Sequence, residues 1–147
     1  MNKDNQIFLF QYYFDYLAES KSIWITPGGS LEEGESFEDA LKRELFEELG
    51  VLWDKDCMEI YYRNPQYTLN TGEVVQSIEK FFLVRMEEEQ FSYANWTESE
   101  KQRVMCGRWW SIEEIQHSKD EFFTGDIICI LTELSDGNIP VTSKKIK

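Results

Sequence analysis

Two kinds of hydrophobic pattern run along the chain, and each predicts a different kind of element. Short runs of aromatic and branched residues, bounded by turn residues, are typical of strands. One such run, Ile7–Tyr16, is so rich in apolar residues that we expect its first half to be buried on both faces. Further strands are predicted over residues 22–26, 59–63, 67–70, 74–86 and 107–110.

Elsewhere, apolar residues spaced three and four apart predict helices. The longest predicted helix covers Phe37–Leu49, with Ser36 placed to cap its first turn and Gly50 placed to end it. Shorter helices are predicted over Ile112–His117 and Asp126–Leu134.

Two stretches show neither pattern. We expect the acidic segment Glu87–Lys101 to be a long loop, and the C-terminal residues 141–147 to be frayed. No repeat or linker divides the chain, so residues 1–147 are predicted to form a single domain. The order of elements predicts an α/β fold in which helices pack on a mixed sheet.

The charge of the chain restricts its partners. The formal net charge is −13, from 28 acidic and 15 basic residues. Such a surface repels a phosphate backbone, so we expect no long nucleic acid as a partner, whereas clustered carboxylates attract divalent cations. No apolar run is long enough to cross a membrane, and three cysteines without a CxxC pair favour a reducing, cytoplasmic environment.

The segment Gly29–Val51, GSLEEGESFEDALKRELFEELGV, carries the most specific pattern in the chain. A glutamate follows the glycine after five residues, and after seven more comes Arg-Glu-Leu-x-Glu-Glu-x-Gly-Val. This pattern resembles the Nudix box at each fixed position. The matching residues are Gly29, Glu35, Arg43, Glu44, Leu45, Glu47, Glu48, Gly50 and Val51. The segments WITPGG and RWWSIEEI also resemble parts of that family's chains.

The acidic residues of the box have a physical explanation that does not depend on the resemblance. Glu44 and Glu48 are one helical turn apart and share a face, which Glu47 borders. Ionised carboxylates so close together repel one another unless cations neutralise them. The alternative is a solvated acidic face on which Arg43 pairs with Glu47.

Resemblance to the Nudix family implies an α/β/α sandwich with the box helix packed on a mixed sheet. It implies hydrolysis of a nucleoside diphosphate linked to another group, in which water attacks a phosphorus of the pyrophosphate. Glu35 and Arg43 would interact and orient the metal ligands. The ligands that it implies, for Mg²⁺ or for Mn²⁺ in its place, are Gly29 through its carbonyl, Glu44, Glu47 and Glu48.

In many members of this family the general base lies outside the box. The candidates here are Glu79, just before the apolar run FFLV, and Glu98 and Glu100 in the acidic segment. We expect Glu87–Lys101 to close over bound nucleotide, with Trp96 contacting the substrate. The alternative is that each glutamate is only surface charge and the segment a surface loop.

The identity of the nucleotide derivative stays open. Some family members carry a marker proline beyond the box and others a marker tyrosine, and Pro65 and Tyr67 fall near both places. Tyr67 is therefore a candidate substrate-binding residue, for ADP-ribose-like compounds or for dinucleoside polyphosphates. A catalytically silent nucleotide sensor and a Ca²⁺-binding protein are the alternative functions. The intact box and the missing EF-hand loop pattern disfavour them.

One feature departs from the family. Only one strand fits before Trp24, where family chains have two. The first strand of the fold is therefore either missing or supplied by another chain, which leaves a homodimer open.

Overall fold

The strands form two three-stranded sheets and one hairpin in the computed structural model, which describes residues 1–147. The first sheet has the order β2-β1-β7 and is antiparallel, with β1 (Ile7–Phe14), β2 (Lys21–Ile25) and β7 (Val104–Trp110). The second has the order β6-β3-β8, with β3 (Met58–Arg63), β6 (Glu79–Leu83) and β8 (Lys144–Lys145). The hairpin consists of β4 (Gln66–Thr68) and β5 (Val74–Gln76).

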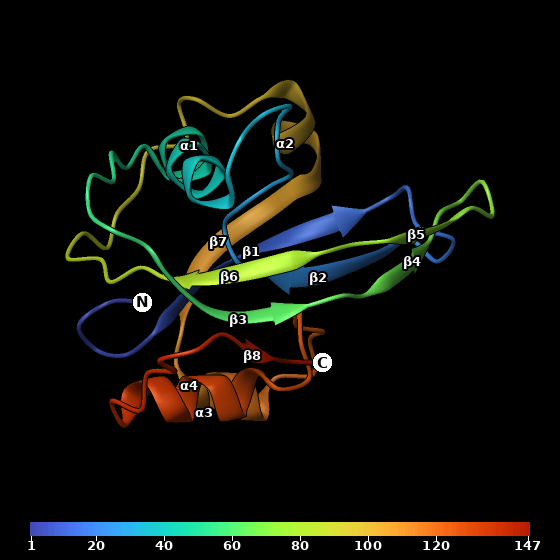
Figure 1. Cartoon of the computed structure of the whole chain (residues 1–147). Helices are drawn as coiled ribbons and strands as arrows, with labels where there is room; N and C mark the ends of the chain where they lie inside the picture. Colours follow the sequence, from blue (N-terminus) through green and yellow to red (C-terminus); the bar gives the residue numbers. More distant parts are fainter.

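Four helices cover the sheets from two sides, as Figure 1 shows. On one side lie α1 (Phe37–Leu49) and α2 (Glu98–Arg103), and on the other lie α3 (Ile112–His117) and α4 (Ile127–Ser135). The sheets are therefore the middle layer of an α/β/α arrangement, and the predicted fold class is confirmed. None of these helices combines the length and the apolar character that a membrane span requires.

Strand β1 is buried on both faces at its start, as its apolar run predicts. Leu9 is 0% exposed and packs in a core cluster with Leu131 of α4. Phe8 and Phe10 point to the opposite face, because side chains alternate along a strand, and they pack in a second cluster with Leu45 of α1. Helix α1 is thus held against the central strand of the first sheet.

Helix α1 has the bounds that the sequence predicts. The Ser36 hydroxyl accepts the backbone N–H of Asp39 at 3.1 Å and caps the first turn. Gly50 ends the helix with a φ of 70°, and its N–H donates to the carbonyl oxygen of Phe46 at 2.9 Å. Both ends are therefore fixed by local sequence.

The prediction of a loop over Glu87–Lys101 is wrong for its last residues, which belong to α2. Strand β7 follows α2 directly and begins earlier than predicted. A capping box formed by Thr97 and Glu100 starts α2. This helix has six residues and no buried side chain, so it leaves no apolar periodicity in the sequence.

Two further expectations are also wrong. The predicted strand over residues 74–86 is divided into β5 and β6, because the N–H of Ser77 donates to the carbonyl of Pro65 at 2.9 Å between the two ladders. The C-terminal tail is not frayed, because β8 pairs with β3 and Ile146 is 8% exposed. The N–H of Ile146 donates to the carbonyl of Tyr62 at 2.9 Å.

One strand, β1, precedes β2, and it lies in the middle of its sheet rather than at an edge. The outer edge of β2 is covered at Trp24, whose N–H donates to the carbonyl of Glu121 at 2.9 Å. The carbonyl of Trp24 accepts the N–H of Phe123 at 2.8 Å. At this point the edge of β2 is occupied by the chain itself.

Candidate metal centre

Two glutamates of α1 point into the protein rather than into solvent. Glu44 and Glu48 lie one turn apart, and each is 7% exposed. The loop after β2 covers this face of the helix, and the backbone N–H of Gly28 donates to Oε2 of Glu48 at 2.7 Å. The sequence predicts the shared face of the two carboxylates, and the loop is what buries it.

Gly29, the predicted backbone ligand, lies against the carboxylate of Glu44. A Cβ added to Gly29 would stand 2.2 Å from Oε1 of Glu44 and 2.7 Å from its carboxyl carbon. A side chain there would displace the carboxylate of Glu44, so glycine is what lets the loop backbone and this carboxylate meet in the observed geometry.

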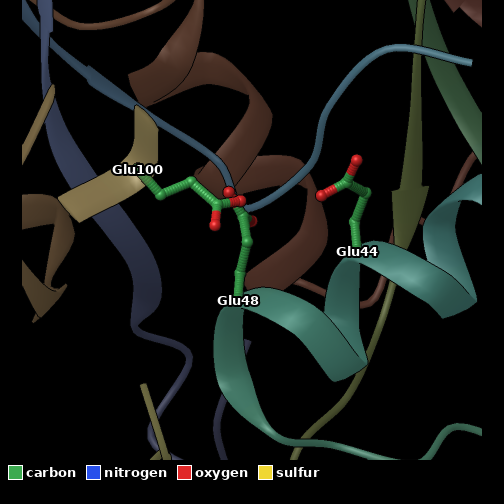
Figure 2. A group of neighbouring side chains, drawn as sticks. All are labelled: Glu44, Glu48 and Glu100. Atoms are coloured by element: carbon green, nitrogen blue, oxygen red, sulfur yellow. The ribbon is translucent and has the colours of Figure 1, made fainter. Parts of the chain in front are cut away.

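A third carboxylate reaches the site from α2. One oxygen each of Glu44, Glu48 and Glu100 lie within 4.8 Å of one another. In Figure 2 the side chains of Glu48 and Glu100 point toward each other from different elements, and Glu44 stands beside Glu48 on the same helix. We refer to these three residues as the carboxylate cluster.

Arg43 joins the neighbouring box residues to this cluster. Its guanidinium makes two hydrogen bonds to Glu35, from Nε to Oε1 at 2.8 Å and from Nη2 to Oε2 at 3.0 Å. Its Nη1 donates to Glu44 at 2.7 Å and to Glu47 at 3.0 Å. The structure therefore contains both the Glu35 pair that the resemblance implies and the Glu47 pair of the alternative interpretation.

The electrostatics of the cluster differ from residue to residue. Burial raises the pKa of Glu48 to about 9, and the hydrogen bond from Gly28 offsets only part of that effect. Burial also raises the pKa of Glu44, against the opposing effect of Arg43. The hydrogen bonds from Arg43 lower the pKa of Glu35.

The donor set suits a divalent cation. Three carboxylate oxygens from two helices converge, and they are hard oxygen ligands of the kind that Mg²⁺ and Mn²⁺ prefer. The buried carboxyl of Glu48 accepts a backbone N–H from Gly28. The neighbouring carboxylates of Glu44, Glu100 and Glu47 add to the effect of burial in raising its pKa. A cation at these oxygens would replace the proton that burial otherwise favours.

Two predicted site residues lie at the margin of this centre. The side chain of Glu47 is 34% exposed and is held by Arg43 rather than by the cluster. Glu98 is 82% exposed at the start of α2, where it pairs with Lys101 at 2.8 Å. Of the two acidic candidates in this segment, the structure brings Glu100 to the cluster and leaves Glu98 outside it.

The third candidate base, Glu79, belongs to a separate polar group. Its carboxylate accepts Nε of Arg63 at 2.7 Å and the hydroxyl of Tyr67, also at 2.7 Å. This contact follows from the register of β3 and β6, which places Arg63 opposite Glu79. The predicted base and the predicted substrate-binding tyrosine therefore contact each other, away from the carboxylate cluster.

Trp96 lies beside the cluster with its polar atom already engaged. Its indole N–H donates to the backbone carbonyl of Glu48 at 2.8 Å. Its ring packs edge-on against Phe10, with centroids 5.6 Å apart, and lies tilted at 37° to the ring of Tyr93, with centroids 4.7 Å apart. Contact of Trp96 with a substrate remains a prediction.

Sequence reasoning missed Thr97, whose backbone N–H and hydroxyl both donate to Oε2 of Glu100. The signal was present, because Thr97 and Glu100 have the spacing of a capping box. Gly28, the donor to Glu48, was also missed, since no side chain marks its role.

Comparisons with known proteins agree with this geometry. A family model described as NUDIX domain matches residues 1–129. An RNA pyrophosphohydrolase from Sulfurovum sp. is 32% identical over 88 residues, which are 54% of this chain and 54% of that protein. The chain therefore spans about half the length of this curated relative.

Solved structures resemble the whole fold. A MutT protein from Methanosarcina mazei Go1 superimposes with a TM-score of 0.59 at 18% identity, over 93% of this chain and 88% of that one. The NUDIX domain of Shewanella oneidensis NrtR, in complex with ADP ribose, superimposes with a TM-score of 0.58 at 17% identity. The match covers 90% of this chain and 77% of that one. At these identities the likeness shows the fold alone.

Proposed function

Since the chain belongs to the NUDIX domain family, as the pattern of Gly29–Val51 predicted, we propose that it is a pyrophosphohydrolase acting on a nucleotide derivative. Water attacks one phosphorus of the pyrophosphate and a phosphate oxygen leaves. The observation that carries the proposal is the carboxylate cluster beside the Arg43 network.

The proposal assigns divalent-ion binding to Glu44, Glu48 and Glu100, with Gly29 at the edge of the site. These oxygens suit Mg²⁺, with Mn²⁺ as a substitute. Bound there, such an ion polarises phosphoryl oxygens and lowers the pKa of bound water. The chain's net charge of −13 otherwise repels a phosphorylated ligand, so the metal is needed to bring the substrate to this surface.

The other box residues keep the ligands in place. Arg43 fixes the orientation of Glu44 and Glu47 while Glu35 fixes Arg43 itself. A planar guanidinium bonded at several points has little freedom to turn, so the carboxylate of Glu44 stays where the loop at Gly29 meets it. This network holds the site's geometry before any substrate arrives.

The substrate is proposed by class only. The NrtR domain was solved with ADP ribose, and the Sulfurovum relative is named for RNA. ADP-ribose, dinucleoside polyphosphates and short RNA bearing a 5′-triphosphate are therefore the compounds to compare. We expect small nucleotides to be preferred, because long RNA meets the repulsion of the acidic surface.

The test is phosphate or pyrophosphate release from this panel, measured with Mg²⁺, with Mn²⁺ and with EDTA. We expect hydrolysis of at least one compound, complete loss in EDTA and recovery on adding either ion. Full turnover in EDTA contradicts the metal site. Tight binding of a compound without any turnover would indicate a nucleotide sensor instead.

A further inference from the structure

Trp96 and Thr97 each donate to a residue of the carboxylate cluster, Trp96 to the backbone of Glu48 and Thr97 to the carboxylate of Glu100. We propose that they are positioning residues, which hold Glu100 against Glu48 and thereby set the affinity of the cluster for divalent cations. This inference rests on the metal site of the proposed function, and it assigns control of that site to residues outside the box.

Helix α2 by itself is too short to hold the side chain of Glu100 in one position. The helix has six residues, Glu98–Arg103, and none of them is buried. Isolated helices of this length are marginal in water, so their own hydrogen bonds do not fix a side chain in space. The position of Glu100 therefore depends on the segments on either side of α2, which are β7, paired with β1, and the residues that precede α2.

The preceding segment is bonded to the last turn of α1. The backbone N–H of Ser92 donates to the carbonyl of Leu49 at 3.0 Å. The side-chain amide of Asn95 donates to the carbonyl of Phe46 at 3.4 Å. The indole N–H of Trp96 donates to the carbonyl of Glu48 at 2.8 Å. The last carbonyls of a helix have no partner within it, so the donors from Ser92 and Trp96 satisfy acceptors at the end of α1. The carbonyl of Phe46 already accepts the N–H of Gly50, and Asn95 adds a second bond to it.

Among these contacts, the one made by Trp96 bears directly on the cluster. Its acceptor is the backbone of Glu48, the residue whose side chain faces Glu100. Its ring packs against Phe10, which is 1% exposed in the core. Trp96 thus connects the core, the backbone of one cluster residue and the segment that carries another.

Thr97 acts on the carboxylate of Glu100 itself. Its backbone N–H and its hydroxyl both donate to Oε2 of Glu100, at 2.5 Å and 2.9 Å. The capping box uses only this oxygen, so Oε1 is left for a ligand. A carboxylate held through one oxygen has a defined orientation for the other, as outer partners of metal ligands commonly provide.

The competing explanation is that the capping box only stabilises α2. The chain contains a matched control, because α3 begins with the same arrangement at Ser111 and Glu114. There the hydroxyl of Ser111 accepts the N–H of Glu114 at 3.2 Å, on the opposite side of the sheets from the cluster (Figure 1). Removing either hydroxyl removes one helix cap, but only Thr97 touches a cluster residue.

The experiment measures Mn²⁺ binding to the full chain without nucleotide, by electron paramagnetic resonance and by calorimetry. Thr97→Val removes the hydroxyl at constant shape and should weaken binding about 10-fold. Thr97→Ser keeps the hydroxyl and should bind as the wild type does. Ser111→Ala should lower the melting temperature without changing the Mn²⁺ affinity.

A second pair of variants tests the indole. Trp96→Phe keeps an aromatic ring but removes the donor to Glu48, and should also weaken Mn²⁺ binding about 10-fold. Trp109→Phe is its control, because the indole N–H of Trp109 donates to the carbonyl of Glu89 at 2.9 Å, outside the cluster. That variant should bind Mn²⁺ normally.

A double-mutant cycle then distinguishes positioning from general stability. If Thr97 acts through Glu100, adding Thr97→Val to Glu100→Gln should weaken Mn²⁺ binding no further than Glu100→Gln alone. Additive losses, or wild-type affinity in both Thr97→Val and Trp96→Phe, overturn the inference and leave the proposed function intact. A wild-type chain that binds no Mn²⁺ overturns both.

Discussion

Arg43 and Glu35 are joined by two parallel hydrogen bonds, from Nε to Oε1 at 2.8 Å and from Nη2 to Oε2 at 3.0 Å. The remaining Nη1 is divided between Glu44 and Glu47. One guanidinium therefore fixes three carboxylates of the box, and a residue with a single charged nitrogen has no geometry for all of these bonds.

Arg43→Lys should accordingly retain the positive charge but lose activity, by about 10-fold or more in kcat, because Glu44 is no longer oriented. The measurement is steady-state kinetics on the best substrate. Lys42→Ala is the control, because Lys42 pairs only with the half-exposed Glu38 on the same helix. Equal kcat in wild type and Arg43→Lys would show that charge alone suffices.

Removal of charge from the cluster should be more severe. Glu44→Gln and Glu48→Gln are expected to lower kcat by about 10²-fold or more, since each removes an anionic oxygen from the metal site. Glu47→Gln should cost less, because this side chain is 34% exposed and bonded to Arg43. Glu38→Gln serves as the control on α1. A folded Glu48→Gln with wild-type kcat would disprove the ligand assignment.

A side chain at Gly29, the first residue of the box, should disturb the carboxylate of Glu44. Gly29→Ala places a methyl group 2.2 Å from Oε1 of Glu44, so either the loop or the carboxylate must move. We expect Mn²⁺ affinity to fall about 10-fold or more while the melting temperature changes little. Gly125→Ala is the control, because nothing lies within 4 Å of its added Cβ. Calorimetric titration of both variants decides the matter.

Glu48 should contribute less to the stability of the metal-free protein as the pH rises. The pKa of Glu48 is about 9 in the folded chain, against 4.5 for an ordinary glutamate, so the folded state binds the extra proton between these values. The contribution of Glu48 to the free energy of unfolding is therefore fully present below pH 4.5 and is lost as the pH rises toward 9. In EDTA, Glu48→Gln should be more stable than the wild type at pH 8, and the difference should shrink toward pH 5.

Thermal melting at a series of pH values measures this effect. Adding Mn²⁺ at pH 8 should reverse it in the wild type, because the ion takes the place of the proton and binds only the folded cluster. A difference in melting temperature between wild type and Glu48→Gln that does not change with pH in EDTA would contradict a raised pKa of Glu48.

The three candidate bases should separate in a side-by-side comparison. A positioned base contributes about 10²–10⁴-fold. Glu100 is also a proposed metal ligand, so Glu100→Gln should depress kcat strongly in either role. Glu98→Gln should leave kcat unchanged, because Glu98 is exposed and pairs with Lys101. Trp96→Ala removes both the ring and the donor to Glu48. A large loss of kcat only in Glu79→Gln would move the base to β6.

The local part of the site followed from the sequence, because its geometry is that of one helix. A period of about 3.6 residues puts Glu44 and Glu48 on one face, and Ser36 and Gly50 fix both ends through bonds to residues three or four positions away. These relations need no knowledge of the rest of the fold. The family resemblance rests on the same segment for the same reason.

Only the tertiary structure shows which of the acidic residues outside the box lies at the carboxylate cluster. Glu98 and Glu100 lie in the same acidic segment, and the capping-box spacing of Thr97 and Glu100 does not say which of the two glutamates reaches the cluster. The bond from Trp96 to Glu48 and the pairing of β7 with β1 bring Glu100, and not Glu98, to it. Glu79 was removed from it by the register that sets it opposite Arg63. The positions of these glutamates depend on which backbone groups far apart in the sequence pair with each other. The spacing of residues along the chain does not predict that pairing.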